Sequence, residues 1–376
     1  MIAYVLPTHN RAAVLSRTLT ALGALPAHDA EVIVVDNASS PPSCPPVRLE
    51  NGLPVTLVMR AENEGAAARN AGVRAADPAC EWVVMLDDDS HPRDLGHLPA
   101  LASQPSDVLA VAAEILLPTE PGAPAHRRRR ESGGLPEVFI GCGVAVRRGA
   151  MLAAGGYDPS FHFYAEEYDL AARLMLAGGR ILMDRRFSVL HEKTSANRSM
   201  DTIVRRLVRN NAWVMQRYAP EGVRRAEISR AVKRYRSIAA KEHAEIGYAM
   251  GRLDMLRTMR GQPRRELGAR LWDRFIGKAA CRRGLLAAWS AQRFDTATLV
   301  APGKNDHVVR ECLEELGVRI VADPADAETL VIATLSPGPM LDAAELLAAD
   351  PRVLMPWAVA GKEAVLGEDA GARAAA

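Results

Sequence analysis

The stretch WVVMLDDDS, residues 82–90, decides the fold of this chain. Five apolar residues run directly into Asp87, Asp88 and Asp89. A continuous apolar run is typical of a strand buried on both faces of a parallel sheet. Three like charges at the end of such a strand repel one another, and a divalent cation with oxygen ligands would hold them ionised. A solvated acidic turn is the alternative that the triplet alone leaves open.

Apolar runs and helical stretches alternate around this strand. We expect strands at 3–6, 31–35, 55–59 and 82–86, and helices at 12–24 and 65–76. This order predicts an α/β fold with a mostly parallel sheet and helices on its faces. Ligands of such sheets bind beyond the carboxyl ends of the strands. Polar residues fall at those places, at 8–10, 36–37 and 87–89.

Composition narrows the class of protein. The chain has 376 residues, of which 48% are hydrophobic, so a packed core is expected rather than disorder. The formal net charge of +2 gives no reason to expect a nucleic-acid partner. Five cysteines without a CxxC pair argue against a disulfide framework or structural zinc. Neither a signal peptide nor a run of about 18 apolar residues is found, so we expect a cytoplasmic protein.

The composition changes twice along the chain. We expect a catalytic α/β domain at 1–200, a basic helical region at 201–292, and a small Rossmann-like αβ module with a frayed tail at 293–376. Residues 119–135, rich in Pro, Gly and Arg, are expected to form a surface loop. The basic helices could contact anionic lipid at the inner face of the membrane, or form a solvated surface. An oligomer or assembly contact, or recognition of the acceptor, is the role expected of the C-terminal module.

Five motifs occur in order along the first half of the chain. They are VLPTHNR (5–11), VIVVDNAS (32–39), NEGAAARNAG (63–72), VVMLDDDS (83–90) and GGYDPSFHFYAEEYDLAARLMLAGGRI (155–181). Together they resemble the motifs of the family 2 glycosyltransferases, which are inverting enzymes of GT-A fold that use nucleotide sugars. The resemblance covers roughly residues 2–195.

This resemblance implies a site for a nucleotide-sugar donor of UDP or dTDP type. Asp36 would accept a hydrogen bond from the base imide, and Asn63 and Arg69 would flank the base and ribose. Asp89 and His191 would ligate Mn²⁺ or Mg²⁺, whereas Asp87 would bind the ribose or orient the metal. The other residues assigned to the donor site are Pro7, Thr8, Asn10, Arg11, Asp88, Gly141 and Gly143.

The YAEEYDLAARL motif supplies the other half of the implied reaction. Glu166, Glu167 and Asp169 begin a predicted helix, where backbone N–H groups favour anionic side chains. Glu167 stands where the family usually has Asp and is expected to be the general base, with Glu166 as the alternative. Asp169 and Arg173 are expected to form a structural pair. No His–Cys arrangement is evident for Cys142.

The expected function is inverting, metal-assisted transfer of a hexosyl or deoxyhexosyl group to a glycan, lipid-linked or protein acceptor. Two alternatives remain at this point. A sugar nucleotidyltransferase would need a glycine-rich signature near the first strand, which PTHNRAAV (7–14) lacks. A catalytically degenerate binding subunit is disfavoured because both carboxylate clusters are present.

Overall fold

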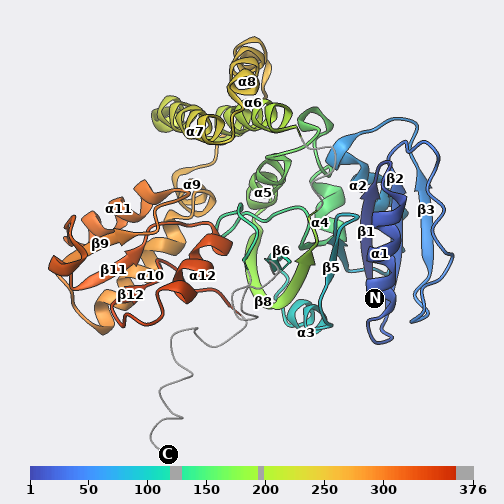
Figure 1. Ribbon diagram of the computed structural model, residues 1–376, viewed down its shortest axis with the longest axis horizontal. Coiled ribbons are helices and arrows are strands. Elements are labelled where there is room, and N and C mark those ends of the chain that lie inside the picture. The colour runs from blue at the N-terminus through green and yellow to red at the C-terminus, as the bar shows by residue number, and fades with distance from the viewer. Residues whose placement is uncertain (119–128, 194–198, 361–376) are drawn as a thin grey trace, which may run out of the picture. The chain divides into compact units, whose positions relative to one another are not determined.

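The structure is a computed structural model that describes residues 1–118, 129–193 and 199–360 (Figure 1). The chain divides into two compact units. The first comprises Met1–His91, Ala145–Arg180 and Lys193–Trp272, and the second comprises Pro92–Val144, Ile181–Glu192 and Asp273–Ala376. Most of the expected surface loop (119–128) and the whole expected tail lie outside the described residues. The expected domain boundaries near residues 200 and 292 remain a prediction.

The first unit is built on a sheet with the strand order β3-β2-β1-β4-β7. The bounds are β1 (Ile2–Thr8), β2 (Ala30–Asp36), β3 (Val55–Met59), β4 (Trp82–Met85) and β7 (Val144–Arg147), of which 145–147 belong to this unit. Neighbouring pairs among β1 to β4 are parallel. Every residue of β4 and all of β1 except Pro7 are buried. The four strands predicted from their apolar runs are therefore confirmed.

The register of these strands places the polar residues at one edge. Thr8 of β1 is paired with Asp36 of β2, and Val5 of β1 is paired with Met85 of β4. Because the strands are parallel, their carboxyl ends meet at the same edge of the sheet. The residues that follow β1, β2 and β4 are therefore close in space, as the sequence predicts.

Helices of the first unit pack on this sheet. They are α1 (Ala12–Gly23), the 3₁₀ turn η1 (Gly65–Ala68), α2 (Arg69–Ala75) and α4 (Arg148–Ala153). Helix α1 buries Leu15, Leu19 and Leu22, which lie on one face of the helix. A Cβ on Gly72 of α2 would lie 2.5 Å from Cγ1 of Val5, so the helix backbone lies directly on the sheet. The helices predicted at 12–24 and 65–76 are confirmed, the second beginning with a 3₁₀ turn.

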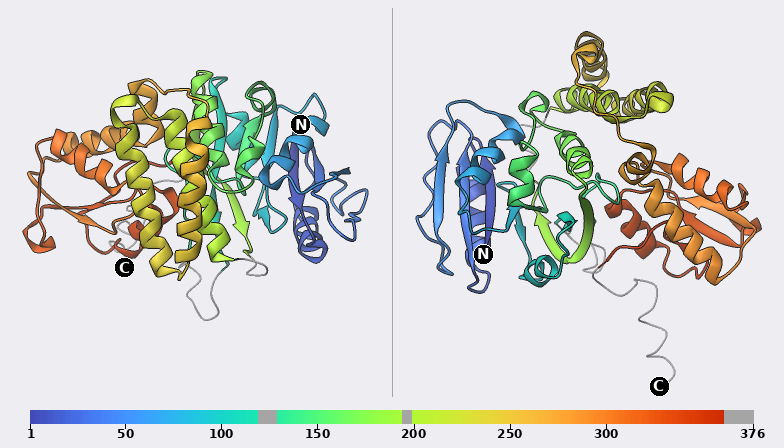
Figure 2. Two further views of the ribbon diagram at one scale, coloured as in Figure 1. Left: turned by 90° about the horizontal axis from the view of Figure 1, so that it is seen from above. Right: turned by 180° about the vertical axis from the view of Figure 1, so that it is seen from behind.

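The remaining helices of the first unit follow α4 along the chain, and α6 to α8 coincide with part of the predicted basic helical region. They include η2 (Pro159–Phe161), α5 (Glu166–Leu176), α6 (Met200–Tyr218), α7 (Glu221–Lys241), α8 (Glu245–Thr258) and η3 (Met259–Gly261). Helix α6 contacts α5, α7 and α8. Helices α6, α7 and α8 lie side by side (Figure 2). A buried cluster of Val204, Val208, Tyr235, Ala239 and Ala244 holds them together. Within the described residues, no helix is long and apolar enough to cross a membrane.

The second unit contains two groups of strands. Strands β6 (Val108–Leu116) and β8 (Arg180–His191), of which 181–191 belong to this unit, are neighbours. The short strand β5 (Ser90–Pro92) contains the chain boundary between the two units, which follows His91. The other group is a parallel sheet in the order β10-β9-β11-β12. Its elements are β9 (Thr296–Val300), α11 (Asp306–Glu315), β10 (Arg319–Ile320), η4 (Pro324–Asp326), β11 (Thr329–Ile332), α12 (Pro337–Leu346) and β12 (Val353–Leu354). The small αβ module predicted at the C-terminus is confirmed.

Three helices remain. Helix α3 (His97–Ala102) belongs to the second unit, and α10 (Lys278–Ala291) precedes β9. Helix α9 (Ala269–Phe275) contains the chain boundary between the first unit and the second. Helix α10 contacts α11 of the C-terminal module. Lys278 of α10 lies 3.0 Å from Glu311 and 3.0 Å from Glu315 of α11, so ion pairs support this contact.

Arg130 joins the two groups of strands in the second unit. Its Nε lies 2.7 Å from Oε1 of Glu114 on β6, and its Nη1 lies 2.8 Å from Oδ1 of Asp342 on α12. Glu345 of α12 is a further partner, and Glu114 also pairs with Arg185 of β8. Burial alone would raise the pKa of Glu114, but Arg130 and Arg185 lower it. The expectation of a surface loop is therefore wrong at Arg130, which is buried.

We predict that Arg130→Met lowers the free energy of unfolding by about 3–5 kcal/mol at neutral pH, because buried Glu114 loses a cation partner. Urea denaturation of the variant and wild type measures this difference. The deficit should shrink as the pH falls, because a carboxyl with a lowered folded pKa contributes stability above its unfolded pKa and loses it on protonation.

The control is Arg310→Met, because Arg310 is exposed on α11 of the same unit. This substitution should change the free energy by less than about 0.5 kcal/mol. Equal stability of the Arg130 variant and this control would contradict the role given to Arg130.

Candidate functional site

Arg11 clamps two of the three consecutive aspartates. It follows β1, and its Nη1 lies 2.6 Å from Oδ1 of Asp88 while its Nη2 lies 2.7 Å from Oδ2 of Asp89. Thr8, the last residue of β1, donates a hydrogen bond of 2.8 Å to Oδ2 of Asp88. Thr18 of α1 donates to the carbonyl oxygen of Asp88 at 2.6 Å. Residues of the first motif and α1 thus hold the end of β4 in place.

Asp88 and Asp89 are almost completely buried, with exposed fractions of 3% and 1%. Burial raises the pKa of Asp88 to about 7, against the opposing effects of Arg11 and Thr8. The neighbouring charges of Asp87 and Asp89 add to this rise. The middle aspartate is therefore held by contacts within the protein, whereas its donor-binding role remains a prediction.

Asp87 differs from its two neighbours because its side chain is 36% exposed. Its Oδ1 pairs with Nη2 of Arg69, which is buried at the start of α2. The same nitrogen donates to the carbonyl oxygen of Leu86 at 3.2 Å. Arg69 thus ties α2 to the end of β4 while the carboxylate of Asp87 remains open to solvent.

These aspartates offer a donor set suited to a hard divalent cation. Mg²⁺ and Mn²⁺ prefer oxygen ligands, and Mg²⁺ typically takes one or two carboxylates and completes its shell with phosphate or water. Asp87 has solvent-exposed oxygens, and Asp89 lies two residues further along the same turn. The residues present therefore fit such a cation, although the structure carries no ion.

Asp36 ends β2 and caps the loop that follows it. Its Oδ1 accepts the backbone N–H of Ser39 at 2.7 Å, and its Oδ2 accepts that of Ser43 at 2.5 Å. Burial would raise the pKa of Asp36, but these hydrogen bonds lower it. Its contacts are those of a turn cap, and the reading of a base imide remains a prediction.

Two asparagines of the predicted donor site support the neighbouring loops. Asn63 accepts a hydrogen bond of 3.0 Å from Nδ2 of Asn37, which follows β2. Asn10 receives the backbone N–H of Ser40 at 2.7 Å and donates its own backbone N–H to Ser39 at 2.9 Å. The loops after β1, β2 and β3 are therefore connected by side-chain amides around one sheet edge.

The turn before α5 has an uncommon backbone. His162, Tyr164 and Ala165 all have positive φ, of 63°, 72° and 67°. Nδ2 of Asn210 on α6 lies within hydrogen-bonding distance of three carbonyl oxygens, at 3.0 Å from Phe161, 2.9 Å from Phe163 and 2.7 Å from Tyr164. Asn210 therefore stabilises the conformation of the turn that precedes α5.

Sequence reasoning missed Asn210, which lies 46 residues from the last of these carbonyls. No local sequence signal identifies it, because its burial and its contacts with the turn follow from the packing of α6. The turn also contacts η1, because the backbone N–H of Ala66 donates to the carbonyl oxygen of His162 at 2.7 Å. Gly65 has a φ of 62°, and a Cβ there would lie 2.2 Å from the same oxygen.

Helix α5 begins with two acids in different surroundings. Glu166 is buried, and its Oε2 has no hydrogen-bond partner among the described residues. Burial raises the pKa of Glu166 well above its ordinary value, and the charge of Glu167 adds to the rise. Glu167 is only half-buried. Nε of Arg69 and the hydroxyl of Tyr157 are two more buried polar atoms that lack a partner in the described structure.

Asp169 is structural, as the sequence predicts. Its Oδ2 accepts from Nε of Arg173 at 2.9 Å, and its Oδ1 accepts from Arg217 and from the hydroxyl of Tyr218 on α6 at 2.8 and 2.7 Å. The predicted pair with Arg173 is confirmed. Helix α6 therefore anchors α5 at two places, through Asn210 at the turn before α5 and through Arg217 at Asp169 in its first turns.

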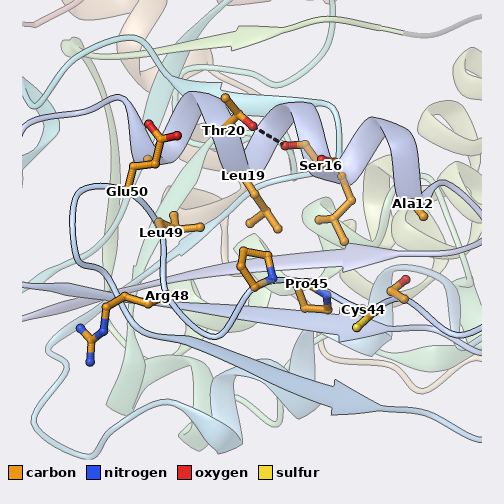
Figure 3. Close-up of a pocket in the computed structure, with 13 residues that line it drawn as sticks. Ala12, Ser16, Leu19, Thr20, Cys44, Pro45, Arg48, Leu49 and Glu50 are labelled. Carbon is orange, nitrogen blue, oxygen red and sulfur yellow. Dashed lines mark hydrogen bonds between the residues drawn. The ribbon is translucent and has the colours of Figure 1, made fainter.

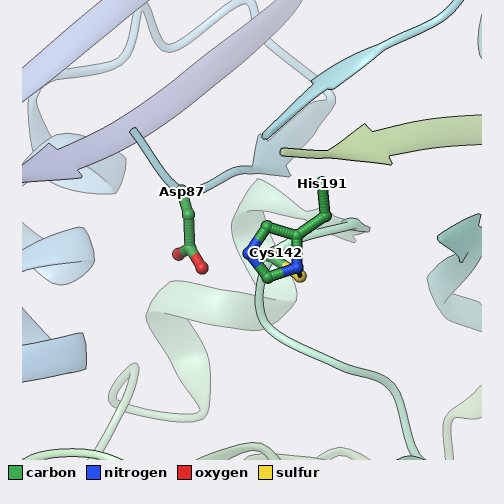
Figure 4. Close-up of side chains that lie close together, drawn as sticks. All are labelled: Asp87, Cys142 and His191. Atoms are coloured by element: carbon green, nitrogen blue, oxygen red, sulfur yellow. Dashed lines mark hydrogen bonds between the residues drawn. The ribbon is translucent and has the colours of Figure 1, made fainter. Parts of the chain in front are cut away.

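Pro7 lies within β1 of the first unit, whereas Gly141, Gly143 and His191 lie in the second unit. Nδ1 of His191, at the end of β8, lies 3.0 Å from Oε2 of Glu131. The same nitrogen lies 3.7 Å from Sγ of Cys142, and Figure 4 shows the imidazole beside this thiol. The expectation that no His–Cys arrangement exists is therefore wrong. Both neighbours approach the same ring nitrogen, however, whereas a nucleophile–base–carboxylate triad uses both nitrogens. The metal-ligand role of His191 remains a prediction, because Asp89 belongs to the first unit.

Two glycines flank Cys142 in the second unit. Gly143 packs against β6, because a Cβ there would lie 2.8 Å from Cγ1 of Ile115. Its carbonyl oxygen accepts the backbone N–H of Ala113 at 2.9 Å. Close packing on β6 is thus a sufficient reason for glycine at this position, and the donor-binding roles of Gly141 and Gly143 remain predictions.

A separate pocket of about 310 Å³ lies between α1 and the segment 43–50 (Figure 3). Leu15 and Leu19 line it on the helix side, and Cys44, Pro45 and Leu49 line it on the other. None of the predicted site residues lines this pocket. The candidate site at the strand edge is therefore distinct from it.

We predict that Arg11→Met destabilises the protein by about 3–5 kcal/mol above pH 7, because it leaves Asp88 and Asp89 buried beside each other without their cation. Chemical denaturation followed by circular dichroism provides the measurement. Arg17→Met on the exposed side of α1 is the control and should change stability by less than about 0.5 kcal/mol. Two variants of equal stability would show that the clamp has no energetic role.

Comparison with known proteins gives a family match for part of the chain. Residues 4–134 match the model of the family described as Glycosyl transferase family 2. A protein of Haemophilus influenzae described as an uncharacterized glycosyltransferase is 24% identical over 193 residues, which are 46% of this chain and 62% of that protein. The chain thus spans less than two thirds of the length of this relative.

Two solved structures are among those similar to this chain. TarS 1–349 of S. aureus in complex with UDP-GlcNAc has a TM-score of 0.48 and 16% identity, covering 78% of this chain and 88% of that one. The mannosyltransferase PcManGT from Pyrobaculum calidifontis, in complex with GDP-Man and Mn²⁺, has a TM-score of 0.45 and 17% identity, covering 68% and 86%. The segment 4–134, which matches the family model, contains β1 to β4 and all three consecutive aspartates.

Proposed function

We propose that this chain is an inverting glycosyltransferase that moves a sugar from a nucleoside-diphosphate sugar to a glycan, lipid-linked or protein acceptor. One observation carries the proposal. The segment that matches the Glycosyl transferase family 2 model holds the strand edge where Arg11, Arg69 and the aspartates 87–89 gather. A donor diphosphate needs cationic partners of this kind, and the parallel strands place them at the edge where ligands bind.

The donor half of the proposed site has two parts. Asp87 and Asp89 would hold Mn²⁺ or Mg²⁺, with His191 as a further ligand, and the chemistry of this cation is to neutralise charge on the departing diphosphate. Asp36 and Asn63 would read the base of a UDP or dTDP donor and face the ribose together with Arg69. The remaining residues proposed to contact the donor are Pro7, Thr8, Asn10, Arg11, Asp88, Gly141 and Gly143.

The acceptor half rests on the start of α5. An inverting transfer needs a carboxylate that takes the proton of the attacking hydroxyl. Burial raises the pKa of Glu166 well above its ordinary value, which makes this acid a poorer candidate for an ionised carboxylate than its neighbour. The half-buried Glu167 is then the carboxylate open to an acceptor, since adjacent acids in different surroundings take different roles. We therefore assign the proton acceptor to Glu167, and to Glu166 a supporting role beside Arg69.

Substitution by glutamine separates these two roles. Glu167→Gln cannot accept a proton and should lower turnover by about 100- to 10,000-fold, with nearly unchanged donor affinity. Glu166→Gln has the shape and charge of the neutral acid, so it should retain most of the activity. Release of nucleoside diphosphate by hydrolysis of UDP-, dTDP- and GDP-sugars provides an assay that needs no acceptor.

The reverse result, an inactive Glu166→Gln and an active Glu167→Gln, would assign the base to Glu166. Full activity of both variants would contradict base catalysis from α5. Donor affinity, measured by calorimetry for each variant, distinguishes a lost proton acceptor from a damaged binding site.

A further inference from the structure

Helix α8 packs on α6 through two glycines. A Cβ on Gly247 would lie 2.2 Å from the carbonyl oxygen of Asp201, and a Cβ on Gly251 would lie 2.5 Å from that of Arg205. These distances are too short for a side chain, so the two helix backbones are in direct contact. Met255 is buried on the same side of α8. The inner face of α8 is thus used by packing within the first unit.

The opposite face of α8 exposes large apolar side chains. Ile246 is 74% exposed, Leu256 64%, Met250 39% and Leu253 38%. Their spacing of four, three and three residues places them on one side of the helix, and we call this set the α8 stripe. Scattered exposed apolar residues are ordinary, but a contiguous set on one helix face marks an interaction surface.

Positive charge surrounds the α8 stripe. Arg252, Arg257 and Arg260 are exposed, and at about 100° per residue Arg257 shares the arc of the stripe, whereas Arg260 follows α8 in η3. Residues 200–260 contain fourteen Lys and Arg against six Asp and Glu, whereas the whole chain has a net charge of only +2. The excess positive charge of the chain is therefore concentrated on α6 to α8.

We propose that the α8 stripe docks on the surface of an anionic phospholipid bilayer. The apolar side chains would enter the boundary between headgroups and acyl chains, as in helices that lie in a membrane interface. The arginines would reach the phosphate groups while their aliphatic stems lie along the apolar surface. This proposal does not depend on the reaction that the site catalyses.

A bilayer fits both features of this surface, and other partners fit only one. A second copy of the chain would bring two regions of excess positive charge together, and like charges repel. A nucleic acid would engage the arginines but leave the apolar side chains without a contact, since its affinity comes mainly from phosphates. An anionic lipid surface supplies both an apolar layer and phosphates.

Sedimentation of the full chain with vesicles tests the proposal. Wild type should sediment with vesicles of phosphatidylcholine mixed with phosphatidylglycerol, and much less with phosphatidylcholine alone. The double variant Ile246→Ser/Leu256→Ser should bind the anionic vesicles at least about tenfold more weakly, because two apolar side chains no longer enter the interface. Arg252→Gln/Arg257→Gln should reduce the preference for anionic vesicles.

The matched control is Val47→Ser/Leu346→Ser, since these residues are 86% and 68% exposed outside α8. It should bind like wild type, and thermal melts should show that all variants are folded. The proposal is overturned if wild type binds neither kind of vesicle, or if the α8 double variant binds as strongly as wild type. If no vesicle binding is seen, dimerisation of the wild type that the α8 double variant loses would indicate a second copy as the partner of the stripe. DNA binding that this variant retains would indicate a nucleic acid as the partner of the arginines. Either result would overturn the proposal.

Discussion

Three consecutive carboxylates at the end of β4, two of them buried, are the constraint on which the first unit depends. Removing such charges from water costs several kcal/mol per ion unless a cation compensates each one. Arg11 and Arg69 reach the triplet from different parts of the chain, one after β1 and the other at the start of α2. The same two arginines therefore stabilise the fold and concentrate charge where a diphosphate would bind.

The start of α5, which we propose faces the acceptor, depends on helix α6 for its position. The turn before α5 contains three residues of positive φ, a conformation that non-glycine residues adopt at a cost of about 1–3 kcal/mol each. Asn210 of α6 offsets this cost by bonding three carbonyl oxygens of the turn, and Arg217 of the same helix holds Asp169. Helix α6 is thus the support that fixes Glu166 and Glu167, and it also carries α8 with its exposed stripe.

Much of the fold could be predicted because its signals are local. The strand at 82–85 and its neighbours follow from short apolar runs, and the αβ module follows from the return of that pattern after residue 293. The ion pairs could not be predicted, because strand register and packing bring their partners together. Arg11 meets Asp88 across 77 residues, and Arg130 meets Glu345 across 215. For the same reason, no local sequence signal predicts the contact between Cys142 and His191. The contact of Asn210 with the turn before α5 could not be predicted either.

The aspartates after β4 are proposed to form a cation-dependent site for a nucleoside diphosphate. The most direct test is calorimetric titration of UDP into the wild type, once with Mn²⁺ and once with EDTA. The same titrations are then made with the Asp89→Ala variant. We predict that Mn²⁺ strengthens UDP binding to the wild type, and that Asp89→Ala in Mn²⁺ has only the weak affinity of the wild type in EDTA. Binding of UDP that is unchanged by EDTA, or unchanged by Asp89→Ala in Mn²⁺, would contradict it.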